Sequence, residues 1–283
     1  MSLLLVLLIP LAVSAITVGG RHHATARRAH PAPRELVRRA LVVLPPHDDQ
    51  RALLRAVDRV LETDPRVDVL VVESSRSSQG AHQISPRVTV VRDPSVDSDT
   101  VALQLGAARA LAHGYDAMIE LSVPQSRLAR RITPLLEALD DGAHVAVGSR
   151  YVPGGRVIGC SQGRRLASRT ANAALRWITG VPVSDLTAHI RAYRRSVVEQ
   201  VLLRATGTSR ALDVDVMLRC WHAGLQVTEV PVTAAGPVCT AITPAGGREL
   251  LARVFTARRR RQLPSHVAGA VDCTDAVIVS AKG

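Results

Sequence analysis

The chain contains few aromatic residues, few cysteines and a single lysine. Aromatic side chains make up 2% of its 283 residues. Because proteins that hold single-stranded nucleic acid stack the bases on aromatic rings, this scarcity argues against a specific nucleic-acid partner. No CxxC pair occurs, which argues against a cysteine-ligated metal site and leaves ordinary reduced thiols. The four cysteines are Cys160, Cys220, Cys239 and Cys273.

Apolar residues and positive charge are both abundant. Apolar residues make up 47% of the chain, enough to bury a core at this length, so wholesale disorder is excluded. The formal net charge is +12, of which +5 falls on residues 1–39, +4 on residues 40–257 and +3 on residues 258–283. Most of the excess therefore lies on two terminal arms, a distribution that suits an anionic membrane surface.

The N-terminus begins with an apolar run. Residues 2–19 carry no charge, and as a helix they would span about 27 Å, close to the thickness of a bilayer core. Arginines follow this run rather than precede it. The positive-inside rule therefore predicts a membrane protein with a single anchor over residues 1–20 and the main domain in the cytoplasm. The alternative is a cleaved signal peptide, since Ala12-Val13-Ser14-Ala15 resembles a cleavage site, although such a peptide carries its positive charge before the apolar run.

Strands and helices alternate along most of the remaining chain. A basic linker over residues 21–39 leads into one domain over residues 40–261, and residues 262–283 form a tail. The alternation predicts an α/β fold with a mostly parallel sheet covered by helices on both faces. Strands are expected at 40–44, 67–72, 87–91, 117–121, 145–148 and 226–232, and helices from Asp49, at 100–113, 127–139, 164–178, 213–222 and 248–261. Ligands bind such sheets beyond the carboxyl ends of the strands, here the loops at 45–49, 73–80 and 121–126.

Four segments of the second half carry a family resemblance. They read GSRYVPGGRV (148–157), RRLASRTAN (164–172), DLTAHIRAYRR (185–195) and GLQVTEVPVT (224–233). In this combination the chain resembles the polyprenol- or dolichol-phosphate mannosyltransferases, inverting family-2 glycosyltransferases with a GT-A fold. The resemblance implies transfer of mannose or a related sugar from a nucleotide sugar to a polyprenyl phosphate at a membrane, with Mg²⁺ or Mn²⁺ as the cofactor.

The resemblance implies a site for the lipid phosphate. Arg150 matches the family's arginine in G-[ST]-R-Y, and Arg164 or Arg165, with Ser168 and Arg169, matches R-R-x-x-S-R. Guanidinium groups and a hydroxyl are suitable donors to a phosphate monoester, and Arg164 and Ser168 lie one helical turn apart. The alternative is a solvated basic helix near anionic lipid.

A second segment implies catalytic residues. Asp185, Thr187 and Arg191 match the family's D-x-T-G-G-F-R, in which the aspartate is the candidate base or orienter. We therefore expect Asp185 and Arg191 to be catalytic, with a structural ion pair as the alternative. Asp215 falls where the family has an acid, and capping or packing explains it equally well.

The nucleotide-sugar half matches less well. Of the family's first two loops, Pro45, Asp49 and Glu73 remain as candidate nucleotide-sugar residues. The family's E-M-D-A-D motif is replaced by Glu120-Leu121-Ser122-Val123-Pro124, so serine and proline stand at both metal-binding positions. Divalent cations prefer carboxylate oxygens, so no metal ligand is expected here and the cofactor stays open.

The lipid-phosphate half matches the family well and the nucleotide-sugar half matches it poorly, and two functions are consistent with this difference. The chain is a glycosyltransferase whose donor site has changed, or a non-catalytic relative that binds polyprenyl phosphate or a membrane partner. Arginine can substitute for a metal at a diphosphate, and Arg127, Arg130 and Arg131 directly follow the altered motif. A solvated helix face is the alternative interpretation of these three residues.

Overall fold

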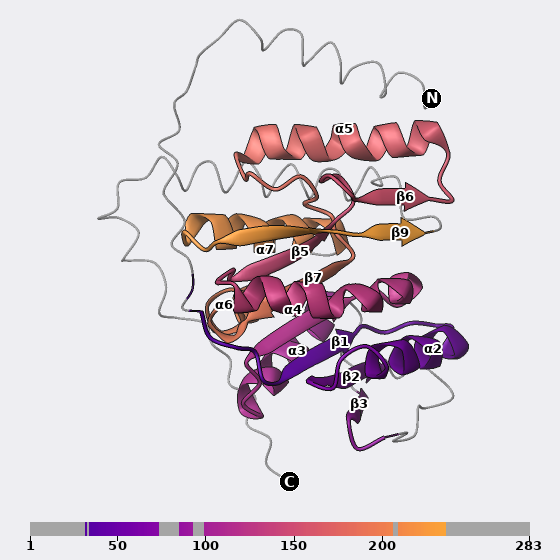
Figure 1. Cartoon of the computed structure of the whole chain (residues 1–283), viewed down its shortest axis with the longest axis vertical. Coiled ribbons are helices and arrows are strands. Elements are labelled where there is room, and N and C mark those ends of the chain that lie inside the picture. Colours follow the sequence, from indigo (N-terminus) through magenta and orange to yellow (C-terminus); the bar gives the residue numbers. More distant parts are fainter. Residues whose placement is uncertain (1–31, 33, 74–84, 93–98, 206–208, 236–283) are drawn as a thin grey trace, which may run out of the picture.

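The computed structural model describes residues 32, 34–73, 85–92, 99–205 and 209–235 (Figure 1). The expected anchor, the C-terminal tail, the helix at 248–261 and most of the loop at 73–80 lie outside these residues. Within the described ranges, no helix is both long enough and apolar enough to cross a bilayer.

A seven-stranded sheet forms the centre of the domain. Its strand order is β3-β2-β1-β4-β7-β5-β8, and every neighbouring pair is parallel except those that involve β7. The strands are β1 (Ala40–Leu44), β2 (Val67–Glu73), β3 (Val88–Arg92), β4 (Ala117–Leu121), β5 (Val145–Ser149), β7 (Ile190–Arg194) and β8 (Val227–Pro231). The predicted α/β sheet is thus confirmed as a mixed, mostly parallel sheet. The antiparallel β7, within a segment that we interpreted only as a motif, lies between β4 and β5.

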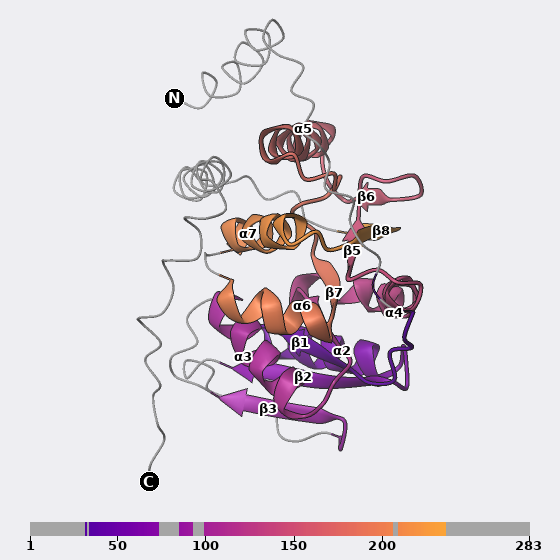
Figure 2. The same cartoon turned by 90° about the vertical axis from the view of Figure 1, so that its left-hand side faces the viewer.

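Helices cover both faces of this sheet, as predicted (Figures 1 and 2). One apolar cluster joins α3, α6 and α7 to alternate residues of the strands, and a second joins α2, η1 and α4 to the intervening residues. The elements are α2 (Gln50–Leu61), α3 (Asp99–Ala112), the 3₁₀ helix η1 (Val123–Arg131), α4 (Ile132–Asp140), α6 (Arg195–Gln200), the 3₁₀ turn η2 (Leu202–Arg204) and α7 (Ser209–His222).

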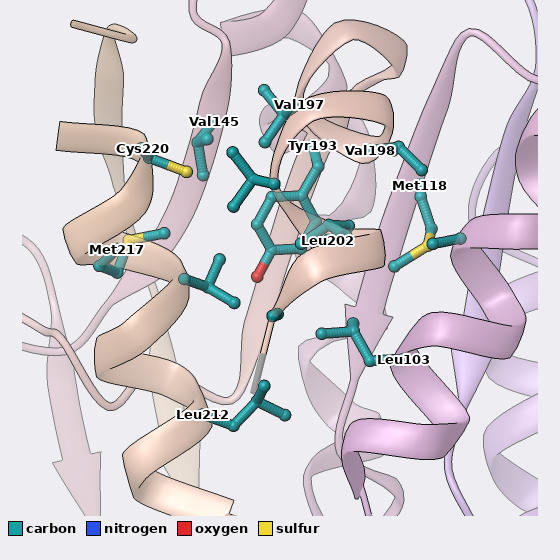
Figure 3. Packing of buried hydrophobic residues seen from close by; sticks show 14 of the residues in the cluster. Leu103, Met118, Val145, Tyr193, Val197, Val198, Leu202, Leu212, Met217 and Cys220 are labelled. Carbon is teal, nitrogen blue, oxygen red and sulfur yellow. The ribbon is translucent and has the colours of Figure 1, made fainter. Parts of the chain in front are cut away.

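The first cluster surrounds β7. Figure 3 shows the ring of Tyr193 between α7, which carries Met217 and Cys220, and Leu103 of α3. Burial raises the pKa of the Cys220 thiol to about 12, so this thiol is protonated at neutral pH. Cys220 therefore acts as a small core side chain, in agreement with the expectation of an ordinary thiol.

The predicted helix at 127–139 is wrong as a single helix. The chain forms η1 directly after β4 and then α4, with a kink at Gln125 where φ is −106° and ψ is 24°. Pro124 lies in the first turn of η1, where proline's missing N–H leaves no hydrogen bond unmade. The proline that replaces an expected metal ligand therefore also starts this helix.

Helix α5 (Gln162–Thr179) lies at one end of the domain, beside the small sheet of β6 (Arg156–Ile158) and β9 (Thr233–Ala235) (Figures 1 and 2). The hydroxyl of Ser161 caps its N-terminus by accepting from Arg164 N, and Gly180 ends it in the left-handed conformation, with φ at 71°. Only Asn172, Leu175 and Thr179 are buried along its 18 residues. The helix therefore packs on the domain through a narrow stripe.

Candidate donor and acceptor sites

The predicted nucleotide-sugar residues follow neighbouring strands. Pro45 comes directly after β1, Glu73 ends β2, and Ser122 follows β4, which pairs with β1 on the side opposite β2. These positions lie at one edge of the sheet, as the loop positions predicted. The structure thus brings the three strand ends to a common edge, which we call the donor edge.

Both acids predicted for nucleotide-sugar binding have structural partners. Arg92 Nε donates to the buried Glu73 carboxylate across β3 and β2, at 2.8 Å. Asp49 caps α2 by accepting from Ala52 N at 2.9 Å, and this hydrogen bond is the main reason why the pKa of Asp49 lies below its usual value. Asp49 therefore acts as a helix cap in this structure.

A charge cluster that is buried apart from Glu120 lies beside the altered motif. Arg191 on β7 contacts Asp213 of α7 at 2.7 Å and Glu120 of β4 at 3.5 Å, and it donates to Leu186 O. The hydroxyl of Tyr193 donates to Glu120 at 3.1 Å. Burial raises the pKa of the Glu120 carboxyl, and Asp213 adds to this effect while Arg191 opposes it. Among the described residues, Arg191 Nε has no hydrogen-bond partner.

At the carboxyl end of β5, the structure brings Arg150 and Asp185 together as a buried pair. Arg150 Nε and Nη2 each donate to one carboxylate oxygen at 2.7 Å, and the Arg150 backbone N–H donates at 3.0 Å. The two side chains are 2% and 0% exposed. Burial alone would raise the pKa of Asp185, but the hydrogen bonds and charge of Arg150 hold it below its usual value.

The segment that carries Asp185 is held by further hydrogen bonds. Glu229 on β8 accepts from the backbone N–H groups of Ser184 and Asp185. Thr187 accepts from Arg150 Nη2 at its hydroxyl, 3.0 Å away, and at its carbonyl, 3.1 Å away. The carboxamide of Asn172, on α5, donates to the same hydroxyl at 3.2 Å. Asp185 thus lies inside a network rather than at an open surface.

Helix α5 presents the other predicted phosphate residues at the surface. Arg164, Arg165 and Arg169 are exposed, and the hydroxyl of Ser168 is 2.6 Å from the hydroxyl of Tyr151. Among the residues that the structure describes, none forms an ion pair with these arginines. The segment therefore combines exposed guanidinium groups with a hydroxyl that Tyr151 holds in place.

The comparisons with known proteins agree with these motifs, although no family model matches the chain. The polyprenol monophosphomannose synthase of Mycolicibacterium smegmatis is 35% identical over 205 residues, which cover 69% of this chain and 77% of that protein. The chain belongs to the polyprenyl-phosphate mannosyltransferase family. A second relative of this family, the undecaprenyl-phosphate mannosyltransferase of Micrococcus luteus, is 29% identical over 203 residues, which cover 69% of this chain and 83% of that protein.

Solved structures show the fold of this mannosyltransferase-family chain. The glucosyl-3-phosphoglycerate synthase of Mycobacterium tuberculosis, in complex with Mn²⁺, UDP and glucosyl-3-phosphoglycerate, matches with a TM-score of 0.54 at 15% identity. The match covers 79% of this chain and 80% of that chain. Its complex with Mn²⁺, UDP-glucose and phosphoglyceric acid also gives a TM-score of 0.54, at 17% identity. The predicted GT-A fold is confirmed.

The described residues at the donor edge do not fit the divalent metal that the family resemblance implies. The backbone of Ser122 forms two hydrogen bonds within the protein: its N–H donates to His189 O, and its carbonyl accepts from Gln125 N. Pro124 has no side-chain ligand atom. The neighbouring acids Glu73 and Glu120 each contact an arginine, which a metal would have to displace. No group of three or more His, Cys, Asp or Glu in the described ranges could hold a metal ion.

Sequence reasoning missed the residues that hold the motifs in place. Asn172, Tyr151 and Glu229 fall inside the quoted family segments, but nothing in their spacing distinguishes them from packing residues. Only Asn172 gave a signal, because asparagine inside a helix of alanines and arginines is a poor helix former. Asp215, which falls where the family has an acid, lies inside α7 and pairs with Arg219 at 2.7 Å.

Proposed function

We propose that this member of the mannosyltransferase family binds a polyprenyl phosphate at a membrane surface and does not carry out metal-dependent sugar transfer. The observation that carries the proposal is the segment after β4, where Ser122 and Pro124 occupy the family's metal positions. A metal supplies several kcal/mol to neutralise a diphosphate leaving group. Because each 1.36 kcal/mol is about tenfold in rate, the loss corresponds to several orders of magnitude.

The acceptor half supports lipid-phosphate binding. In this proposal Arg164 and Arg169 donate to the phosphate and Ser168 adds a hydroxyl, which is the chemistry that a phosphate monoester requires. The charged groups of the buried Arg150 and Asp185 already contact each other, so this pair would support α5 rather than bind the phosphate directly. We call α5 and this pair together the acceptor region. Arg191 would balance the acids under the donor edge.

The surface of α5 supports a membrane location. Leu166 is 64% exposed and Trp177 is 62% exposed, and the two lie on one side of the helix because 11 residues make about three turns. Arg165, Arg169 and Arg176 form a row beside them, and the helix contains no acid. An apolar stripe beside a row of arginines is typical of a helix that lies in the headgroup region of an anionic bilayer. The proposed N-terminal anchor would keep the domain at the cytoplasmic face.

A metal-independent glycosyltransferase is the second candidate. Arg127 and Arg130 are exposed on η1, directly after the altered motif. Their guanidinium groups could neutralise a donor diphosphate in place of a metal. This candidate requires nucleotide-sugar binding that depends on these arginines.

Two titrations separate the candidates. In the first, the full chain is titrated with GDP-mannose, with and without Mn²⁺ or Mg²⁺. We expect no binding at millimolar concentrations, and metal-dependent binding would overturn the non-catalytic proposal. Metal-independent binding that Arg127→Ala and Arg130→Ala remove would favour the second candidate.

In the second titration, the chain binds vesicles that contain polyprenyl phosphate or unphosphorylated polyprenol. We expect a clear preference for the phosphate, and equal binding would overturn the acceptor assignment. Trp177 reports the orientation of α5 in a Trp221→Phe variant, where its fluorescence should shift to the blue on anionic vesicles. An unchanged spectrum would exclude the membrane role of α5.

A further inference from the structure

We infer that Asn172 is a positioning residue that fixes α5, and with it the proposed phosphate-binding arginines, against the buried Arg150–Asp185 pair. The inference rests on the proposed lipid-phosphate site and adds to it a residue that does not contact the phosphate. It begins from the placement of an amide side chain inside a helix. Asparagine is unfavourable there relative to alanine, so its presence requires compensating contacts.

The carboxamide of Asn172 makes contacts in two directions. The side chain is 2% exposed. Its Nδ2 donates to Ser168 O at 3.0 Å, one turn back along α5, and to the Thr187 hydroxyl at 3.2 Å. Its Oδ1 accepts from Leu186 N at 2.9 Å. A buried amide with all of these partners in place is rigid, and losing it would leave a buried backbone N–H without a partner.

The contact to Thr187 joins α5 to the charged pair. The Thr187 hydroxyl also accepts from Arg150 Nη2 at 3.0 Å and lies 3.5 Å from Asp185 Oδ1. The hydroxyl is therefore the meeting point of the helix amide, the guanidinium and the carboxylate. Because these buried groups are closely packed, a shift of Asn172 would also move Thr187 and Arg150.

Two further side-chain hydrogen bonds of α5 reach beyond the helix. The hydroxyls of Ser168 and Tyr151 lie 2.6 Å apart. The hydroxyl of Thr179 donates within the helix, to Leu175 O, and accepts from Val181 N just after the helix ends. Arg164 lies about two turns from Asn172 on a mostly exposed helix, so a small rotation of α5 would displace its guanidinium from a bound phosphate.

The test measures phosphate-dependent binding of the full chain. Asn172→Ala should weaken binding to polyprenyl-phosphate vesicles about tenfold, which is about 1.4 kcal/mol, and leave binding to polyprenol vesicles unchanged. Gln104→Ala, which removes a carboxamide of α3 that donates to Leu203 O and Ala205 O, is the matched control and should change neither. Thr187→Val removes the bridging hydroxyl with little change in volume, and it should reproduce the effect even where Asn172→Ala folds poorly.

A double-mutant cycle with Arg164→Ala separates positioning from general destabilisation. If Asn172 acts by placing the arginines, Asn172→Ala should have little further effect once Arg164 is removed. Additive losses, or an unchanged affinity in both Asn172→Ala and Thr187→Val, would overturn the inference. If wild type itself does not prefer the phosphorylated lipid, the proposed function fails first, and wild-type binding measured alone distinguishes that case.

Discussion

The donor edge and the acceptor region treat their charged residues in opposite ways. At the donor edge the acids contact arginines, the buried Glu73 with Arg92 and the half-buried Glu120 with Arg191. On α5 the arginines are exposed, and no described residue forms an ion pair with them. The first region pairs its acids with arginines of the protein, whereas the second leaves its arginines exposed to solvent.

This difference shows how a binding site can change while the fold is kept. The metal positions of the family follow β4, and Ser122 takes part in the sheet only through its backbone, so serine and proline replace the acids without disturbing a core side chain. Arg150 and Asp185 are buried, and replacing either would leave an unpaired charge in the interior. Positions that bear only on ligand binding are therefore free to change before positions that also hold the fold.

Breaking the buried acceptor pair should have the largest effect. Asp185→Ala leaves the Arg150 guanidinium without its partner and should lower the free energy of unfolding by about 3–5 kcal/mol, measured by chemical denaturation. Asp49→Ala, which removes only an exposed helix cap at the donor edge, should have a much smaller effect. If the two variants lose the same stability, the contrast between a structural acceptor pair and a peripheral donor acid is wrong.

Restoring the family's acids at the donor edge should have the next largest effect. In a Ser122→Asp, Pro124→Asp double variant, we expect Mn²⁺ to strengthen GDP-mannose binding about a hundredfold, because a metal contributes several kcal/mol at a diphosphate. Arg127→Asp adds an acid nearby but outside the motif and serves as the control. If the restored acids gain nothing over this control, the donor edge has changed beyond its metal positions.

Removing arginines from each region should then separate their roles. Arg164→Ala with Arg169→Ala should weaken binding to polyprenyl-phosphate vesicles about tenfold or more, since charge-assisted hydrogen bonds contribute about 1.5–3 kcal/mol each. Arg127→Ala with Arg130→Ala removes the same charge from η1 and should have little effect. Equal losses in the two double variants would indicate attraction by net charge alone, which high salt would abolish.

The sequence predicted the main sheet well because buried strands carry a clear signal. The apolar runs at 40–44 and 117–121 correspond to β1 and β4 residue for residue. The predicted helix at 127–139 was wrong because periodicity alone does not distinguish a 3₁₀ helix from the first turns of an α-helix. Pro124 gave a local signal for the start of η1 that was interpreted only as a lost ligand.

The residues of the site were predicted in identity but not in arrangement. The motifs singled out Arg150, Asp185 and Arg191, yet a sequence cannot show that the first two contact each other and that the third contacts Asp213. Those partners lie 35 and 22 residues apart, and the contacts depend on where β7 enters the sheet. Asn172 was not predicted for the same reason. Its partners Leu186 and Thr187 lie in a loop that only the fold brings next to α5.

The smallest effect compares the fully buried carboxyl of Asp185 with the half-buried carboxyl of Glu120, whose pKa values are shifted in opposite directions. The folded pKa of Asp185 lies below its usual value, so its stabilisation is complete above that usual value and is lost as the pH falls through the folded pKa. The pKa of Glu120 is raised, mainly by burial, so ionising it reduces stability as the pH rises from its usual value through the folded pKa. Glu120→Gln keeps an acceptor for Tyr193 and removes this charge. The variant should match wild type in acid and melt at an equal or slightly higher temperature at pH 7, because the remaining Asp213 still balances Arg191. A clearly lower melting temperature at pH 7 would show that Arg191 needs both acids, and that the donor edge depends on its ion pairs as strongly as the acceptor region does.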